Sequence, residues 1–341
     1  MTAKSRHVTI KDVAKQAGVS IQTISRVIND RPDVSPQTRQ HVQAIISKLG
    51  YQPFANARGL AAQRTYTLGL VTADFSDFWF SQVVTGAEKE AQVHGYCFML
   101  GNSNCEPEDE PKFLRLLTER HVEGILFVRA SCADEHNPLV HLKDFGVPIV
   151  TVGYHPETGL ALVDVDNVNG GRKATEYLLG LGHTHIAMIA GPSNWKSVRE
   201  RSEGYQRALQ NAGLPVVPEL MLEGNWLHSS GYTQTKALLT SQRPFTAIFA
   251  HNDRIARGAI HALVEVGLRV PEDISVIGYD DIPEAEFSDP PLTTIQQPMT
   301  EIGEVAVRRL IQMIEDATLA PETILFDTTL IVRSSCAPPK P

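Results

Sequence analysis

Polar and aromatic residues follow several short apolar runs of this 341-residue chain. The runs LGLVT, GILFV, IAMIAG, TAIFA and ISVIGY are typical of strands buried in a parallel sheet. The residues that follow these runs are Ala73, Asp74, Phe75, Ser76, Asp77, Phe78, Trp79, Phe80, Arg129, Trp195, Arg199, Arg201, His251, Asn252, Asp253, Asp280 and Asp281. Because ligands of open α/β sheets bind beyond the carboxyl ends of the strands, we expect these residues to converge on one cleft.

This set of side chains suits a ligand with many hydroxyl groups. Carboxylates and amides form paired hydrogen bonds with neighbouring hydroxyls, arginine donates in a planar fork, and aromatic faces pack on the C–H face of a sugar ring. Other interpretations stay open for single residues. Asp253 could cap the helix that follows it, and Asp281 is more typical of a solvated or capping acid. We expect either Trp79 or Phe80 to lie in the core.

The elements that must position these residues alternate between strands and helices from residue 66 onward. Helices are predicted near residues 79–94, 107–120, 136–145, 168–181, 198–212 and 254–267. Parallel strands joined by helices form a doubly wound sheet that is covered on both faces. We therefore expect an α/β fold with two similar lobes, near 66–163 and 164–296. A last helix near 299–316 and a final strand near 323–333 remain to be placed.

The first fifty residues follow an all-helical pattern instead. Thr9 is expected to cap a first helix that ends at Gly18, and Ser20 to cap a second helix that ends near Ile28. A third helix is predicted over 35–50, with proline at its first position. A helix, a tight turn with glycine and a second exposed helix form a helix-turn-helix.

The second helix has a polar outer face that suits the major groove of DNA. Gln22 can bond bidentately to adenine and Arg26 to guanine. The expected DNA-contacting residues of this head are Thr9, Ser20, Ile21, Gln22, Thr23, Ser25, Arg26 and Asn29. Residues 1–65 have a net charge of +7, whereas the whole chain has −8 and the remainder therefore −15. A basic head on an acidic body favours DNA binding over a solvated helical bundle without a DNA role.

Composition and motifs argue against several other classes of protein. No run approaches the roughly 18 apolar residues of a membrane span. The start MTAKSRHVTI lacks the apolar core of a signal peptide, so we expect a cytoplasmic protein. The four cysteines show no CxxC spacing and are most simply free thiols. His183 and His185 have no acid or thiol at metal-binding spacing, and no nucleophile elbow, P-loop or HExxH motif is present. We expect no enzymatic activity, no metal and no cofactor.

The start of the chain resembles the head of the LacI/GalR family of bacterial transcriptional repressors. The resemblance rests on the segment TIKDVAKQAGVSIQTISRVIND and on the segment VSPQTRQHVQAIISKLGYQPFANARGLA that follows shortly after it. The resemblance continues across nearly the whole chain. It implies a core like that of a periplasmic sugar-binding protein, whose chain crosses between the lobes three times. The expected parts are a helix-turn-helix domain 1–52, a hinge 53–65, a first lobe 66–163 with 297–322, and a second lobe 164–296 with 323–336.

The resemblance also implies roles for residues of the hinge. This segment resembles a hinge helix that orders only on the operator. Leu60 matches the leucine that wedges into the minor groove, where such an insertion bends the duplex. Asn56, Ala57 and Arg58 match the neighbouring positions of that motif.

In the core, the resemblance implicates particular residues in effector binding. AGPSNWKSVRERSEGY, HNDRIARGA and SVIGYDD match family motifs that assign this role to Arg201, Asn252 and Asp280, and Trp226 aligns with an aromatic residue that stacks on sugars. The expected effector-binding residues are Ala73, Asp77, Trp79, Phe80, Arg129, Trp195, Arg201, Trp226, Asn252 and Asp280. The chain departs from the family at DFWF, residues 77–80, at Gly153 and at Val165, so the ligand's identity stays open.

These features together predict a homodimeric repressor of a carbohydrate-utilisation operon. It would bind a palindromic operator, and a small sugar that closes the cleft would release it. A corepressor-dependent regulator or an activator with the same fold is an alternative. A sugar-binding transport component belongs to a different class and would share the core. The missing signal sequence and the basic head both count against that class.

Overall fold

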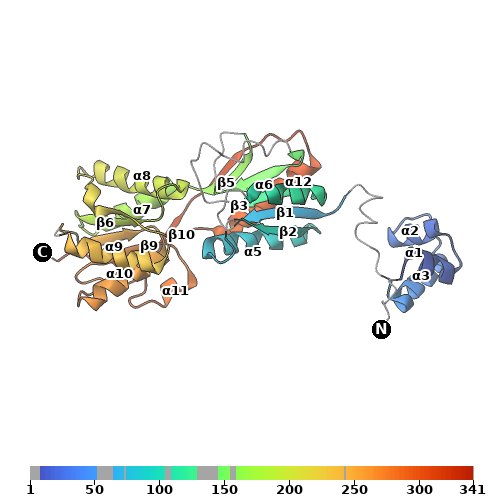
Figure 1. The fold of residues 1–341 in the computed structure, drawn as a ribbon, viewed down its shortest axis with the longest axis horizontal. Helices are drawn as coiled ribbons and strands as arrows, with labels where there is room; N and C mark the ends of the chain where they lie inside the picture. The colour runs from blue at the N-terminus through green and yellow to red at the C-terminus, as the bar shows by residue number, and fades with distance from the viewer. Residues whose placement is uncertain are drawn as a thin grey trace. The chain divides into compact units, whose positions relative to one another are not determined.

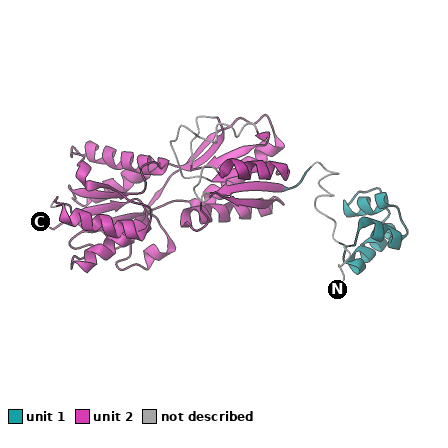
Figure 2. Ribbon diagram, in the orientation of Figure 1, with its two compact units in different colours: residues 1–66 teal, residues 67–341 magenta. Residues whose placement is uncertain are grey.

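A computed structural model of the chain describes residues 8–51, 64–72, 74–103, 109–128, 145–153, 159–241 and 243–340. The chain divides into two compact units, residues 1–66 and residues 67–341 (Figure 2). Each unit has its own apolar core. In the described part of the chain, no helix has both the length and the apolar character needed to cross a bilayer.

The described residues of the first unit form three helices, which confirms the expected head. They are α1 (Ile10–Ala17), α2 (Ile21–Ile28) and α3 (Pro36–Leu49). Thr9 and Asp12 form a capping box at the start of α1, with the Thr9 amide 2.9 Å from the Asp12 carboxylate. Gly18 ends α1 at φ +64°, a left-handed conformation that favours glycine. The three helices bury Val13, Ile24, Val27 and Val42 between them, which leaves the opposite face of α2 to solvent.

The first lobe of the core is a six-stranded sheet in the order β11-β5-β4-β3-β1-β2 (Figure 1). Its strands are β1 (Thr67–Thr72), β2 (Cys97–Asn102), β3 (Gly124–Val128), β4 (Ile149–Val152), β5 (Ala161–Val165) and β11 (Thr323–Phe326). All neighbours in this sheet pair in parallel. The helices among its described residues are α5 (Phe78–Val93), α6 (Glu110–Glu119) and α12 (Met299–Glu315). The last helix thus returns to the first lobe and packs closely on α5. A Cβ on Gly86 would lie 1.9 Å from the Thr300 carbonyl oxygen, so this approach needs glycine.

The second lobe repeats this plan with the order β12-β10-β9-β8-β6-β7 (Figure 1). Its strands are β6 (Ile186–Ala190), β7 (Met221–Glu223), β8 (Ala247–Ala250), β9 (Ser275–Asp280), β10 (Thr293–Gln296) and β12 (Thr329–Ile331). Its helices are α7 (Asn167–Gly180), α8 (Lys196–Asn211), α9 (His228–Thr240), α10 (Asp253–Glu265), the short α11 (Pro283–Glu286) and the 3-10 turn η2 (Pro218–Leu220). Only β12 runs antiparallel to its neighbour.

The chain crosses between the lobes after β5, after β10 and after β11. The third crossing corrects the expected composition of the lobes. The sequence predicts one strand near 323–333 and assigns residues 323–336 to the second lobe, but the segment forms two strands. β11 pairs with β5 in the first lobe, with Ile324 opposite Val163, and β12 then joins β10 in the second. The predicted helix at 136–145 falls almost entirely outside the described residues.

Candidate functional site

In the head, α2 exposes most of the residues expected to meet DNA. Ile21, Gln22 and Arg26 are exposed, while Ile24 and Val27 face the core. Ile21 keeps 45% of its surface accessible. An exposed apolar side chain of this kind can contact a thymine methyl group, and exposed Gln and Arg side chains can bond to base edges.

Other expected residues of the head have structural roles as well. The Ser20 hydroxyl accepts from the Thr23 amide at 3.0 Å and caps α2. Thr9 caps α1 in the same way, and Asn29 donates to the Ser25 hydroxyl at 3.4 Å. Thr9, Ser20, Ser25 and Asn29 can still contact phosphate, because hydroxyl and amide groups form more than one hydrogen bond.

Arg26 lies 3.3 Å from Asp33, and both side chains are about half exposed. Such a pair is weak and leaves the guanidinium available to a base. The hinge residues Asn56, Ala57, Arg58 and Leu60 lie outside the described residues, so their predicted roles stay predictions.

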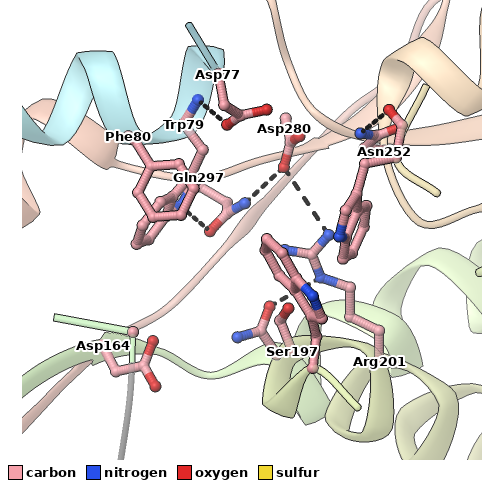
Figure 3. Close-up of a pocket in the computed structure, with 13 residues that line it drawn as sticks. Asp77, Trp79, Phe80, Asp164, Ser197, Arg201, Asn252, Asp280 and Gln297 are labelled. Carbon is pink, nitrogen blue, oxygen red and sulfur yellow. Dashed lines mark hydrogen bonds and ion pairs between the residues drawn. The ribbon is translucent and has the colours of Figure 1, made fainter. Parts of the chain in front are cut away.

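In the core, a pocket of about 560 Å³, partly open to solvent, lies between the two lobes (Figure 3). Its lining residues are Asp77, Trp79, Phe80, Gly153, Asp164, Asn167, Trp195, Ser197, Arg201, Trp226, Asn252, Asp280 and Gln297. Eight of the ten residues expected to bind an effector therefore lie together. Ala73 and Arg129 fall outside the described residues.

Arg201 is held rigidly on α8. Its Nε donates to the Asn167 side chain at 2.9 Å, and another guanidinium nitrogen donates to the carbonyl of His251. The guanidinium lies 3.7 Å from the centre of the Tyr279 ring and 4.0 Å from the Asp280 carboxylate. Because only 5% of Arg201 is exposed, these contacts fix the orientation of its guanidinium.

Asp280 ends β9 in an unusual backbone conformation. Its φ is +109°, and Asp281 follows at +56°. Non-glycine residues at such angles cost of the order of 1–3 kcal/mol each, which is typical of functional sites. The strained turn brings the Asp280 carboxylate to the pocket, where Gln297 donates to it at 2.6 Å (Figure 3).

The protonation of Asp280 is also unusual. Burial raises the pKa of Asp280 to about 7, although the nearby Arg201 lowers it.

Asp281 differs from the solvated or capping acid that we expected. Its side chain is nearly buried and lies 2.7 Å from Arg333.

Asn252 shapes the mouth of the pocket beside α10. Its side chain caps α10 by accepting from the Ile255 amide at 2.8 Å, and it donates to the carbonyl of Trp226 at 3.1 Å. The capping role considered for Asp253 therefore belongs to Asn252. Asp253 is fully buried and accepts from the Thr294 hydroxyl at 2.6 Å. Burial raises the pKa of Asp253 well above its usual value.

Aromatic rings flank these polar groups on two sides. Trp195 and Trp226 of the second lobe have ring centres 5.3 Å apart. The φ of Trp226 is +68°, and its buried Nε1 has no hydrogen-bond partner among the described residues. On the first lobe, the indole of Trp79 donates to Gln297 at 3.0 Å. Phe80 is 2% exposed and is the member of the Trp79–Phe80 pair that lies in the core, at the edge of the pocket.

Asp77 comes from the first lobe as well. It caps α5 by accepting from the Trp79 amide at 2.9 Å, and it lies 3.5 Å from Arg254 of α10. Burial raises the pKa of Asp77, and Arg254 partly opposes the shift.

Five lining residues were not among the residues expected to bind an effector: Gly153, Asp164, Asn167, Ser197 and Gln297. Asn167 was within reach of the sequence, since it follows the end of strand β5 at the start of α7. Gln297 sits on a crossing between lobes, which no local pattern marks. Arg199, which was a candidate, is exposed and does not line the pocket.

No group of three His, Cys, Asp or Glu residues in the described ranges could hold a metal ion. His183 has a structural environment. Its ring nitrogens lie 2.8 Å from the Thr246 hydroxyl and 2.9 Å from the Ala337 carbonyl. Burial lowers the pKa of His183, which suits a neutral ring that ties the C-terminal segment to the second lobe.

Comparison with known proteins agrees with both units. Residues 9–53 match the family "Bacterial regulatory proteins, lacI family", and residues 175–336 match a "Periplasmic binding protein-like domain". The chain is 38% identical over 331 residues to the HTH-type transcriptional repressor PurR of Haemophilus influenzae, which covers 96% of this chain and 98% of that protein. It is 34% identical over 334 residues to the HTH-type transcriptional regulator DegA of Bacillus subtilis, with 97% and 98% covered.

Solved structures agree on the fold. The lac repressor dimer bound to operator and the anti-inducer ONPF superposes with a TM-score of 0.90 at 31% identity, over 97% of this chain and 100% of that chain. A complex of the transcriptional regulator CelR with cellobiose gives a TM-score of 0.74 at 35% identity, over 96% and 100%. The chain therefore belongs to the LacI family of bacterial transcriptional regulators, which bind DNA and catalyse no reaction.

Proposed function

We propose that this chain is a transcriptional repressor whose affinity for its operator is controlled by a neutral sugar in the pocket between the lobes. The observation that carries the proposal is the arrangement of Arg201, Asn252 and Asp280 between aromatic residues of both lobes (Figure 3). An arginine fork, an amide and a carboxylate match neighbouring hydroxyls, and indole faces match the C–H face of a sugar ring.

The charges around the pocket favour a neutral ligand. Three carboxylates line it, those of Asp77, Asp164 and Asp280. Each already has a cation nearby: Arg254 at 3.5 Å, Lys196 at 2.5 Å and Arg201 at 4.0 Å. A phosphorylated or acidic sugar would bring a further anion beside these carboxylates, with no described cation at the pocket free to meet it. Like charges in a site of low polarity repel strongly.

A purine base is the second candidate. The relatives named PurR favour it, and the paired rings of Trp195 and Trp226 could also stack on a flat base. The two candidates differ in hydrogen bonding. A sugar presents hydroxyls that both donate and accept, which suits Asp280 and Arg201 at 4.0 Å from each other.

Thermal unfolding of the purified chain with a panel of compounds tests the proposal. The panel contains glucose, ribose, lactose and cellobiose, with glucose 6-phosphate, gluconate, hypoxanthine and guanine as rivals. A ligand at 100 times its Kd stabilises the folded state by about 2.7 kcal/mol, which is several degrees for a chain of this size. We expect a neutral sugar to raise Tm, and the Asp280→Ala variant to lose that rise. A rise caused only by a purine or by a phosphorylated sugar would contradict the proposal.

We further propose that the chain binds a palindromic operator as a homodimer in the bacterial cytoplasm. Phe287 is 83% exposed and lines a groove with Ile260, His261 and Val264 on the second lobe. Exposed apolar side chains of this size are typical of protein interfaces. Analytical ultracentrifugation should find twice the chain mass of 37.5 kDa. Sedimentation as a monomer at micromolar concentration would contradict dimer formation.

A corepressor-dependent regulator or an activator stays the alternative. The sign of the effector's effect on operator binding separates a repressor that the effector releases from one that the effector activates.

The operator contact can be tested at one residue. Replacing Arg26 with alanine should weaken specific binding by about 1–3 kcal/mol, the usual value of one bidentate contact with guanine. Mobility-shift titration of operator and random DNA measures the change. Lys48→Ala at the far end of α3 is the control, and its loss should be equal for both DNAs. An unchanged preference of the Arg26→Ala variant for operator would contradict the assignment.

A further inference from the structure

Helix α8 belongs to the second lobe, but its first residue makes an ion pair with the first lobe. The Lys196 ammonium lies 2.5 Å from the carboxylate of Asp164, which is on β5. It also lies 2.9 Å from Glu200, one turn further along α8. Asp164 is almost fully buried, with 3% of its side chain exposed, and Lys196 is 18% exposed.

The residue before Lys196 makes the same connection through apolar surface. Trp195 packs against the apolar core of the first lobe and also against that of the second. The start of α8 therefore contacts the first lobe through both a charge and an indole ring. These contacts lie at the pocket, which Trp195 and Asp164 both line.

The environment of Lys196 makes its pairing important. The charged groups that face it are Asp164 from the first lobe and Glu200 from its own helix, with Asn167 3.5 Å from Glu200. A buried ion pair adds little net stability compared with an apolar pair of similar volume. Removing one partner is costly, because the other charge is left without compensation. Contact between the buried Asp164 carboxylate and the second lobe is therefore favourable only while the Lys196 ammonium compensates its charge.

A second ion pair between the lobes differs in kind. Arg254 and Asp77 are 3.5 Å apart, and each keeps more than a quarter of its side chain exposed. Water can replace either partner at low cost there. Of the two pairs, the Lys196 pair is the one whose loss leaves a buried charge.

We propose that Lys196 is a positioning residue that fixes the arrangement of the two lobes beside the pocket, through its ion pair with Asp164. This role does not depend on whether the ligand of the pocket is a sugar or a purine.

Hydrogen–deuterium exchange of the full-length chain without effector tests this. The variants are Lys196→Met, Asp164→Asn and the double variant, and the reporter amides are those of residues 149–153 and 161–168. Lys236→Met is the matched control, because Lys236 pairs with Glu265 within the second lobe and both side chains are exposed. We expect each single variant to exchange at least about tenfold faster at the reporter amides, as for loss of a buried charge partner. The double variant should recover most of the protection, and Lys236→Met should match the wild type.

The outcomes separate a link between lobes from a local role in α8. Faster exchange confined to residues 196–211 would overturn the proposal, as would unchanged exchange in a folded Lys196→Met variant. If Lys196→Met does not fold, Asp164→Asn and Lys196→Arg decide. Lys196→Arg keeps the charge and should stay within about threefold of the wild type, whereas Asp164→Asn should not. Equal exchange in these two variants would overturn the proposal.

Discussion

The pocket has two walls that are built differently: the first wall comes from the first lobe and the second wall from the second lobe. The second lobe supplies Arg201, Asn252 and Asp280, each fixed by hydrogen bonds within that lobe or from Gln297, which follows β10. The first lobe supplies Asp77 and Trp79 from the partly buried start of helix α5. The second wall is thus held by more contacts than the first. We infer that the second lobe selects the ligand.

Backbone strain follows the same division. Trp226 and Asp280 have positive φ on the second wall. Among the described lining residues of the first lobe, only Gly153 does, and glycine adopts that conformation without strain. Gln297 joins the walls, since it accepts from Trp79 and donates to Asp280. Strain is tolerated where a fixed direction of a side chain matters most.

The largest expected effect comes from replacing Arg201 with methionine. This change removes the Arg201 donor from the Asn167 and His251 oxygens and leaves Asp280 without its nearest cation. We expect the free energy of unfolding to fall by about 3–5 kcal/mol, as for removal of one partner from a buried charged network. Urea unfolding followed by circular dichroism measures it. Arg199→Met is the control, since Arg199 is exposed on the same helix, and it should change stability by less than about 0.5 kcal/mol. Similar losses in both variants would mean that the second wall is not specially organised.

The second effect is a dependence of stability on pH. The pKa of Asp280 is raised to about 7 in the folded protein, from an unfolded value of 3.8. The folded state therefore holds a proton that the unfolded state has lost, and this stability is fully present below pH 4 and lost as pH rises through 7. The Asp280→Asn variant lacks this loss. Relative to the wild type, it should gain about 2–4 kcal/mol in free energy of unfolding between pH 4.5 and pH 8.

Urea unfolding of both proteins at several pH values measures this difference. Asp316→Asn is a suitable control, because hydrogen bonds from Thr318 lower the pKa of Asp316. The contribution of Asp316 to stability therefore changes with pH in the opposite direction to that of Asp280. A difference between Asp280→Asn and wild type that stays flat from pH 4.5 to pH 8 would show that Asp280 is ionised at ordinary pH. The second wall would then carry a permanent charge.

Helix ends and strands that are marked by a local sequence pattern were predicted correctly. Thr9 with Asp12, Ser20 and Gly18 each mark a helix end in the head, and the structure confirms those ends. The apolar runs likewise predicted the central strands β1, β3, β6, β8 and β9. The rule that ligands bind beyond such strands brought Asp77, Arg201, Asn252 and Asp280 to one pocket.

The sequence did not predict the features of elements and side chains that depend on partners distant in the chain. β11 and β12 are two residues apart and belong to different sheets, and alternation of polar and apolar residues cannot choose between sheets. Helix α9 was not predicted, because HSSGYTQTKALLT has a weak apolar stripe. The burial of Asp253 and the pairing of Asp281 with Arg333 depend on residues more than forty positions away. Lys196 and Asp164 are likewise separated in sequence, so no local motif marks their contact.

The smallest effect tests the first wall. Arg254 and Asp77 lie 3.5 Å apart across the lobes, and both are partly exposed. Arg254→Met should lower the free energy of unfolding by no more than about 1 kcal/mol, because water can solvate Asp77 in place of the guanidinium. Urea unfolding at pH 7 in low and high salt measures the loss, which should shrink further as salt screens the pair in the wild type. A loss of about 3 kcal/mol or more, insensitive to salt, would place this pair in the same class as the buried charges of the second lobe. The first wall would then be as rigidly organised as the second, and ligand selection could no longer be assigned to one lobe.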